Sequence, residues 1–263
     1  MNIEEQYSIQ SLEAGVDEVG RGPLAGPVSA AAVILDPEVK IEGLKDSKKL
    51  SKKMREFLSE EIQKKAICWN IASVGREKID SINILQASLL AMKEAVEGLK
   101  IKPEIILVDG ENELDTHITS RAIINGDQQV ESIMAASIIA KVSRDKFMTD
   151  LDHKYPEYGF KSHKGYGTKE HLLALKLYGP CDEHRESFSP VAEVIKNNHS
   201  KYSDDWKKRS LVREKLTNMN DDQISFWLKE EEQKSKTYSY ELRKILRQEW
   251  VFIRDASQWR KFK

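Results

Sequence analysis

The pattern of apolar and polar residues over positions 1–199 predicts strands that alternate with helices. Residues 14–19 and 28–35 are expected to be strands, and the second is apolar on both faces, which is typical of a strand in the middle of a sheet. A turn rich in glycine and proline, residues 20–27, joins the two into an early hairpin. Further short strands are expected at residues 66–74, 104–110 and 121–125.

Helices are expected between these strands and after them. Ser51 can cap the first, which runs to about residue 65, and a second runs from about Asn83 to Gly98. The residues expected to face the core from these two helices are Met54, Phe57, Leu58, Ile62, Ile84, Leu85, Ala87, Leu89, Ala91, Met92 and Val96. The later helices are expected at about residues 130–151, from a cap at Thr168 to residue 178, and from Ser189 onward. This order of elements predicts an α/β domain built on a mixed central sheet flanked by helices.

After about residue 199 the pattern changes, and an all-helical C-terminal extension is expected. Residues 202–263 have helical spacing throughout, contain four of the five tryptophans, and include neither glycine nor proline. We therefore divide the chain into an α/β domain at 1–199 and an extension at 200–263. Residues 201–263 carry 16 Lys and Arg against 11 Asp and Glu, so a basic extension follows an acidic body. The extension can bind nucleic acid by stacking and charge, or its tryptophans can pack it on the body, which is the interpretation we favour.

Composition narrows the class of protein. Hydrophobic residues make up 40% and charged residues 32% of the chain, as in an ordinary globular protein, and the net charge of −1 does not by itself indicate a nucleic-acid partner. No apolar run approaches the ~20 residues that cross a bilayer, and no signal peptide is recognisable. Cys68 and Cys181 lack the spacing of a zinc site. We expect a cytoplasmic monomer without a membrane partner.

Candidate chemistry is concentrated in four carboxylates at the ends of expected strands or turns, namely Asp17, Glu18, Asp109 and Asp127. A glycine lies close to each, which leaves room for a ligand near the backbone. On a regular strand the neighbours Asp17 and Glu18 would leave opposite faces, so both can serve one site only if the strand ends or distorts there. Because open α/β sheets gather functional residues at strand ends, we expect the four acids to converge.

A cluster of acids without basic partners is tolerated when divalent cations fill it. Oxygen ligands suit Mg²⁺ or Mn²⁺, and two such ions clamp the attacking and leaving oxygens of a phosphodiester. A single Asp at a strand end is more often a cap or a turn residue, and Asp109 alone would be interpreted in that way. The set of four favours a metal site.

Several motifs in fixed order resemble the ribonuclease HII family over about residues 10–195. They are GVDEVGRGPLAGPV at 15–28, DSKKL at 46–50, VDG at 108–110, GD at 126–127, SIMAASIIAKVSRD at 132–145, HKGYGT at 163–168 and HRESF at 184–188. The resemblance implies a ribonuclease H-like fold and an endoribonuclease that cuts on the 5′ side of a ribonucleotide. Its substrates would be RNA–DNA hybrids and duplex DNA with single embedded ribonucleotides, and its products would carry a 3′-OH and a 5′-phosphate. Asp17, Glu18, Asp109 and Asp127 would be the catalytic ligands of two Mg²⁺ or Mn²⁺ ions.

The resemblance also implies how the substrate is recognised. Gly20, Arg21 and Gly22 would lie along the minor groove and recognise the ribose 2′-OH, largely through the backbone. Tyr166 would stack on the sugar at the ribonucleotide–deoxyribonucleotide junction. The 2′-OH distinguishes RNA from DNA, and glycines allow the backbone to approach it. A plain tight turn at residues 20–22 and a core position for Tyr166 are the alternatives.

Basic residues near these motifs are candidates for phosphate contact. Lys48 would contact substrate, and so would Lys141 and Arg144, although both can equally act from behind the site or be exposed without a specific role. For Lys52, Lys53 and Arg55 we favour a solvated face.

His163 and His184 have no second His or Cys at metal spacing, so we expect them to order loops or to face the substrate. Met134 stands where the family usually has a small residue, which alters only packing. The extension after residue 200 has no counterpart in the minimal family pattern. About ten residues precede the first strand, which leaves no room for the extra N-terminal domain of the related HIII enzymes.

Two other functions fit parts of this pattern. Another nuclease or strand-transfer enzyme on the same fold would share the acids, but the Gly-Arg-Gly and Gly-Tyr-Gly elements argue against it. A catalytically silent binder of RNA–DNA hybrids would gain nothing from four acids that face phosphates.

Overall fold

The computed structural model describes residues 12–198, with residues 222, 223, 226 and 230. The chain divides into two compact units, one of residues 1–175 and 180–192 and the other of residues 176–179 and 193–263. The first unit contains every residue predicted to act in the site. The predicted helical extension at 200–263 lies outside the described residues, except for the four helical positions 222, 223, 226 and 230.

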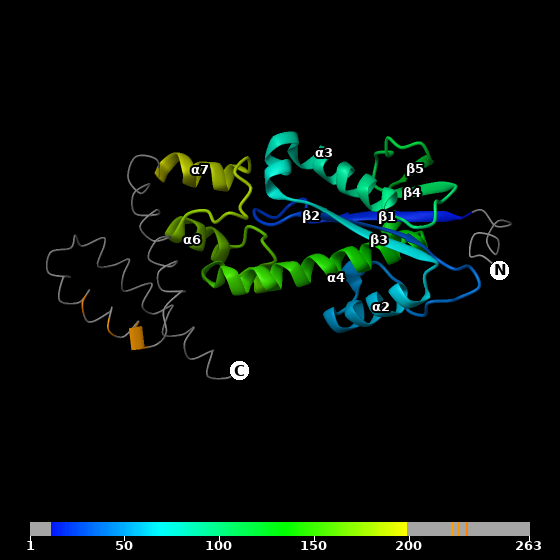
Figure 1. The fold of residues 1–263 in the computed structure, drawn as a ribbon, viewed down its shortest axis with the longest axis horizontal. Helices are drawn as coiled ribbons and strands as arrows, with labels where there is room; N and C mark the ends of the chain where they lie inside the picture. The colour runs from blue at the N-terminus through cyan, green and yellow to red at the C-terminus, as the bar shows by residue number, and fades with distance from the viewer. Residues whose placement is uncertain (1–11, 199–221, 224–225, 227–229, 231–263) are drawn as a thin grey trace. The chain divides into compact units, whose positions relative to one another are not determined.

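A five-stranded mixed sheet forms the centre of the first unit (Figure 1). The strands, in the spatial order β3-β2-β1-β4-β5, are β1 (Glu13–Val19), β2 (Val28–Ile34), β3 (Cys68–Val74), β4 (Ile105–Asp109) and β5 (Thr119–Ile123). β1, β2 and β3 are antiparallel neighbours, whereas β4 is parallel to both β1 and β5. The sheet confirms the predicted mixed architecture, and each predicted strand is present with its ends shifted by a few residues.

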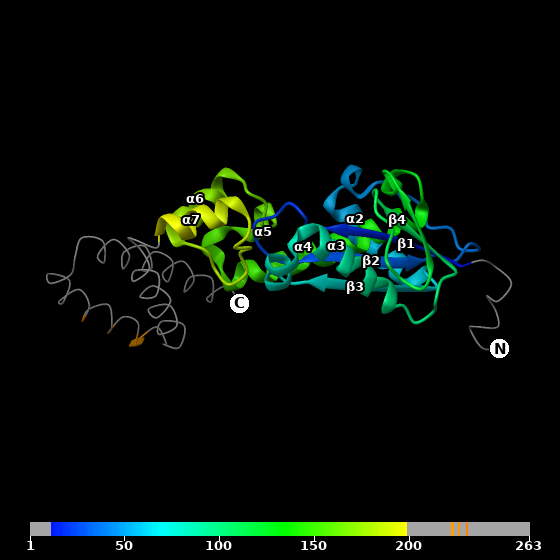
Figure 2. The same ribbon diagram turned by 90° about the horizontal axis from the view of Figure 1, so that it is seen from above.

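Helices cover both faces of this sheet (Figures 1 and 2). α3 (Arg76–Glu97) packs on one face against Ala30 and Ala32 of β2. α2 (Lys52–Lys65) and α4 (Glu131–Lys154) pack on the other against Ala31 and Val33. Because β2 is covered on both faces, all of its residues are buried, as its apolar pattern predicted.

The remaining described elements are short: η1 (Ser47–Lys49), η2 (Gly126–Gln128), η3 (Pro156–Tyr158), α5 (Phe160–His163), α6 (Lys169–Tyr178) and α7 (Ser189–Asn198). The two predicted caps are confirmed, since Ser51 Oγ accepts the N–H of Met54 and Thr168 Oγ1 accepts the N–H of His171, both at 3.3 Å. None of the described helices combines the length and apolar character needed to cross a membrane.

Two details of the predicted helices are wrong. In α2, Met54 and Phe57 are 45% and 56% exposed, and the buried face is made by Leu58, Ser59 and Ile62.

In α3, Leu85 is exposed, and the helix begins at Arg76. The predicted start at Asn83 marks a kink, where that residue has φ 67° and its side chain accepts the N–H of Gln86. The pattern therefore identified the second part of α3 and missed the first.

Candidate active site

Three of the predicted acids meet at one edge of the sheet because β1 and β4 are parallel neighbours. Their paired register ends at Val16 and Val108, so Asp17 and Asp109 follow at adjacent strand ends. η2 brings the third acid, since Asp109 Oδ1 accepts the backbone N–H of Asp127 at 3.2 Å. Residues more than 100 positions apart in the sequence thus face a common region.

The adjacent acids Asp17 and Glu18 lie at the end of β1, which was one of the two conditions stated for them to serve one site. β1 ends at Val19, one residue after Glu18, and its antiparallel pairing with β2 continues up to that residue without distortion. On its other side, β1 has no strand partner at Asp17 and Glu18, because its parallel pairing with β4 stops after Val16. The N–H of Glu18 then donates to Asp17 Oδ1 at 2.7 Å, and Glu18 Oε1 accepts from Arg21 Nη1 at 3.5 Å.

Burial and mutual repulsion raise the pKa of three acids in this cluster. Asp17 is 6% exposed, and its burial, followed by the charge of Glu18, raises its pKa well above the ordinary value. Burial is also the largest cause of the raised pKa of Glu18 and of Asp109, and the charge of Asp109 acts further on Glu18. The cluster therefore disfavours its own negative charge, which a cation would relieve.

A lysine supplies positive charge at Asp127. Lys48 Nζ donates to Asp127 Oδ2 at 3.0 Å, and this hydrogen bond is the largest cause of the raised pKa of Lys48. The lysine side chain remains 78% exposed, whereas that of Asp127 is 3% exposed. η1 carries Lys48 and is joined to α4 by the hydrogen bond of 2.9 Å between the Ser47 and Ser137 hydroxyls.

The oxygen atoms of the four acids suit a hard divalent cation, although the acids do not converge closely. Within the described ranges, no three carboxylate, imidazole or thiol groups converge closely enough to hold a metal ion. Asp17, Glu18, Asp109 and Asp127 nevertheless offer only oxygen ligands, and burial, with mutual repulsion added to it, raises the pKa of the first three. A cation that binds Asp127 at Oδ2 would have to displace the ammonium group of Lys48, which donates to that oxygen.

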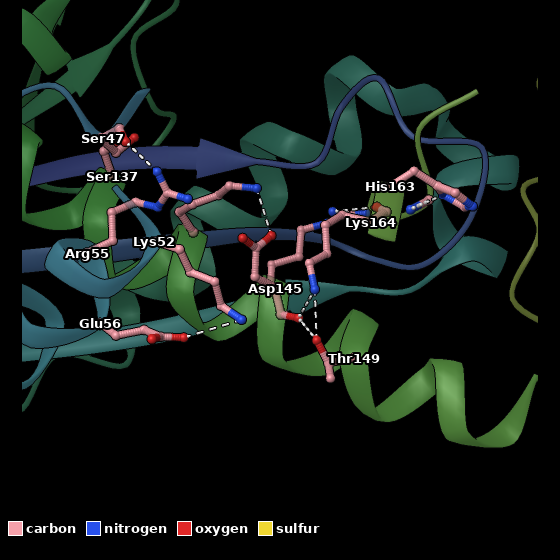
Figure 3. A network of polar contacts seen from close by, with 12 residues as sticks. Ser47, Lys52, Arg55, Glu56, Ser137, Asp145, Thr149, His163 and Lys164 are labelled. Carbon is pink, nitrogen blue, oxygen red and sulfur yellow. Dashed lines mark hydrogen bonds and ion pairs between the residues drawn. The ribbon is translucent and has the colours of Figure 1, made fainter. Parts of the chain in front are cut away.

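Arg55 binds the backbone of the loop that carries Lys48, whereas a solvated face was expected for it. Arg55 Nη1 donates to the carbonyls of Ser47 and Leu50 at 3.0 and 2.6 Å, and Figure 3 shows its guanidinium directed toward Ser47. That expectation is therefore wrong for Arg55. Lys52 does lie on an exposed face, where it pairs with Glu56 at 3.7 Å.

The predicted ribose-recognition residues lie together beside the acids. Gly20 has φ 100°, and an added Cβ would overlap the side chain of Arg144, so glycine is required there. A Cβ on Gly22 would lie 3.4 Å from the ring of Tyr166, which places the two residues in contact distance. Tyr166 is 42% exposed, so the core position considered for it is wrong.

Arg144 and Lys141 differ in their surroundings. Arg144 is 1% exposed, and it donates to the carbonyls of Pro27, Ala25 and Lys164 at 2.9, 3.2 and 3.1 Å. This environment agrees with the alternative that Arg144 acts from behind the site, since it ties the glycine-rich loop of residues 20–27 to the segment before Tyr166. Lys141 Nζ pairs with Asp145 Oδ1 at 2.7 Å and is partly exposed. Lys164 Nζ also approaches Asp145, at its carbonyl, and the hydroxyl of Thr149 (Figure 3).

Arg185 is a residue of the site that the sequence analysis missed. It is fully buried, and its guanidinium donates to the carbonyls of Gly20, Arg21 and Gly26 at 2.7, 3.0 and 2.9 Å. Burial, followed by the charge of Arg144, lowers its pKa to about 9. The HRESF motif was the available signal, but its arginine lies 165 positions from Gly20 and carries no mark of that contact.

His163 and His184 make contacts that order loops, which is one of the two roles expected for them. His163 Nε2 lies 2.7 Å from the Tyr158 carbonyl, and His163 Nδ1 accepts the N–H of Gly165 at 3.3 Å. His184 is fully buried and receives the N–H of Cys181 at Nδ1.

Comparisons with known proteins agree with this geometry. The family model described as Ribonuclease HII matches residues 14–191. A Ribonuclease HII of Delftia acidovorans is 58% identical over 184 residues, 70% of this chain and 78% of that protein. A Ribonuclease HII of a Polaromonas strain is 56% identical over 190 residues, 72% of this chain and 96% of that protein. The crystal structure of ribonuclease H2 from Pyrococcus horikoshii matches with a TM-score of 0.60 and 29% identity, over 71% of this chain and 98% of that one. The last match confirms the expected ribonuclease H-like fold.

Proposed function

Since this chain belongs to the ribonuclease HII family, and is therefore a metal-dependent endoribonuclease of the ribonuclease H type, we propose that it cuts the phosphodiester on the 5′ side of a ribonucleotide. The substrates are RNA–DNA hybrids and duplex DNA with single embedded ribonucleotides, and the products carry a 3′-OH and a 5′-phosphate.

One observation carries this proposal: the glycine-rich loop continues directly from the strand that holds two of the acids. Gly20 lies two positions after Glu18, and Tyr166 lies against Gly22. A ribose bound at this loop therefore places its neighbouring phosphate close to the acids. Because only two positions separate Glu18 from Gly20, recognition of the ribose is coupled to cleavage of the neighbouring phosphodiester.

Arg185 decides which backbone groups of the loop face outward. Its guanidinium takes the carbonyls of Gly20 and Arg21, so these point into the protein. In a planar trans peptide the carbonyl and the following N–H point in opposite directions. The N–H groups of Arg21 and Gly22 are thus directed away from Arg185, where they can donate to a ribose 2′-OH oxygen.

The acids supply the ligands for the metal chemistry. Asp17, Glu18, Asp109 and Asp127 would hold two Mg²⁺ or Mn²⁺ ions, which would supply an activated water and stabilisation of the leaving oxygen. Lys48, mostly exposed and able to reach Asp127, is also placed to meet a phosphate. Lys141 is partly exposed and can do the same from α4.

We expect the protein to cut a DNA duplex with one ribonucleotide on the 5′ side of that residue, in the presence of Mg²⁺ or Mn²⁺. The measurement compares this duplex with an RNA–DNA hybrid and with all-DNA and all-RNA duplexes of the same sequence. A polymerase extends the upstream product only if it ends in a 3′-OH. Cleavage of the all-DNA duplex at a similar rate would identify a different nuclease, and hybrid binding without cleavage would identify a silent binder.

Tyr166→Ala is expected to weaken cleavage at a single embedded ribonucleotide, because the exposed ring is lost from its place over Gly22. Stacking is worth about 1–3 kcal/mol, which corresponds to roughly a 5- to 150-fold loss in kcat/KM. Tyr166→Phe keeps the ring and is the matched control. A lower unfolding temperature with an unchanged preference for the ribonucleotide would contradict the assignment.

A further inference from the structure

Two buried histidines lie behind the substrate-facing loops and have no part in the function described so far. His171 of α6 and His184 are both fully buried, and their Nε2 atoms are 3.0 Å apart. At that separation one nitrogen must donate and the other must accept. Only one of the two Nε2 atoms therefore carries a proton.

The partners of the other ring nitrogens determine which one it is. His171 Nδ1 lies 2.9 Å from the carbonyl of Tyr166, which can only accept, so His171 Nδ1 carries a proton. His184 Nδ1 lies 2.9 Å from the backbone N–H of Cys181, which can only donate, so His184 Nδ1 carries none. For two neutral rings, His184 Nε2 is then the donor and His171 Nε2 the acceptor. A directional chain runs from the N–H of Cys181 through both rings to the carbonyl of Tyr166.

The surroundings keep both rings neutral. Burial is the largest cause that lowers the pKa of His171 to about 4 and that of His184 to about 3. A proton added to either ring would set two N–H groups against each other, either between the Nε2 atoms or at Cys181. The chain therefore persists at neutral pH.

This chain joins the two loops that are proposed to meet the ribonucleotide. At one end it holds the backbone of Tyr166, whose N–H also donates to the His163 carbonyl at 2.9 Å. At the other end His184 precedes Arg185, which holds the carbonyls of Gly20 and Arg21. His184 also forms a β-bridge with Ala25 of the glycine-rich loop.

We propose that the His171–His184 pair is a positioning device that fixes the backbone of Tyr166 relative to the Gly20–Gly22 loop, so that ring and backbone donors meet the same ribonucleotide. The inference rests on the proposed function for its role in recognition. The tautomers of the two rings follow from the contacts alone, and they can be tested without any cleavage assay.

The first test is a long-range ¹H–¹⁵N spectrum of the histidine-labelled full chain at neutral pH, with His171→Asn and His184→Gln used to assign the two rings. We expect a protonated Nδ1 with a bare Nε2 for His171, and the reverse for His184. The opposite tautomer at either ring, or a doubly protonated ring, would overturn the proposal. This result stands whether or not the protein prefers embedded ribonucleotides.

The second test is a double-mutant cycle with Tyr166→Ala, measured on the single-ribonucleotide duplex. His171→Leu removes the donor to the Tyr166 carbonyl, and losing one hydrogen bond is expected to raise KM by roughly 2- to 10-fold with little change in kcat. His171→Asn offers an amide donor at the place of Nδ1 but no acceptor for His184 Nε2, so its KM is expected to lie between that of the wild type and that of His171→Leu. In the Tyr166→Ala background, His171→Leu should have no further effect on KM.

A merely structural role for His171 gives a different result. The losses from His171→Leu and Tyr166→Ala would then multiply, and His171→Asn would show no rescue; either finding overturns the proposal. If the wild type cuts all-DNA and single-ribonucleotide duplexes alike, the proposed function fails instead, while the ring tautomers still decide whether the histidine chain exists.

Discussion

Asp17→Asn is expected to abolish cleavage, with a loss well above the roughly 10- to 100-fold that removing a hydrogen-bond partner of a metal ligand costs, and at the same time to stabilise the metal-free protein. Both effects follow from the position of this carboxyl group. Asp17 is buried at the end of the parallel pairing between β1 and β4, close to the charges of Glu18 and Asp109. An amide of the same shape can still accept the N–H of Glu18, but it binds divalent cations weakly.

The sign of the stability effect follows from the raised pKa of Asp17. Between the ordinary value for an aspartate and the raised value in the folded protein, the folded state binds more protons than the unfolded state. Stability therefore falls as pH rises through this window, and the full penalty is present above the raised pKa. Asparagine carries no charge and avoids the penalty, so the variant should unfold at a higher temperature at neutral pH and depend less on pH.

Thermal unfolding with and without Mg²⁺ measures this effect, and the same samples serve for cleavage. Mg²⁺ should stabilise the wild type, because a ligand that binds only the folded state raises its stability, and should stabilise the variant much less. Asp115→Asn, at an exposed loop position, is the matched control and should leave both measurements unchanged. Cleavage close to that of the wild type by Asp17→Asn at saturating Mg²⁺ would contradict a metal-binding role.

The sequence was sufficient to predict features that depend only on residues close to one another along the chain. The apolar run of β2, the Ser51 and Thr168 caps and the acids at strand ends are each visible within a few neighbouring residues. The ordered motifs then indicated the family. What could not be predicted depends on which element lies opposite: β1 keeps its register because β2 continues beside it, and the edge opens because β4 stops.

Arginines that bind backbone carbonyls were the main source of error, since an arginine in a sequence is most simply expected at the surface. Arg55, Arg144 and Arg185 all donate to backbone carbonyls of loops that they hold in place. Their partners are distant in the sequence for Arg144 and Arg185, and carbonyl groups are present in every residue. No pattern of residue types therefore marks these contacts.

Arg185→Met is expected to destabilise the fold and to remove the preference for ribonucleotides, because three inward carbonyls lose their donor together. An unsatisfied buried group costs about 1–3 kcal/mol, so the loss in unfolding free energy should be about 3 kcal/mol or more. For a domain of this size that corresponds to a fall of roughly 6–12 °C in the unfolding temperature. Below that temperature, KM for the single-ribonucleotide duplex should rise toward the value for an all-DNA competitor.

Two further variants test whether the effects of Arg185→Met come from the lost hydrogen bonds to the loop or from the loss of any arginine. Arg121→Met, at an exposed position of β5, should change neither stability nor preference. Arg185→Lys keeps a buried charge but cannot span the carbonyls of Gly20, Arg21 and Gly26 with the same fork, so it should recover part of the stability and little of the preference. Thermal unfolding and competition cleavage measure the two effects independently. If Arg185→Met folds normally and still selects the ribonucleotide, the orientation of the Gly20–Gly22 backbone does not depend on this guanidinium, and the outward direction of its N–H groups must be set by the strand and the glycines alone.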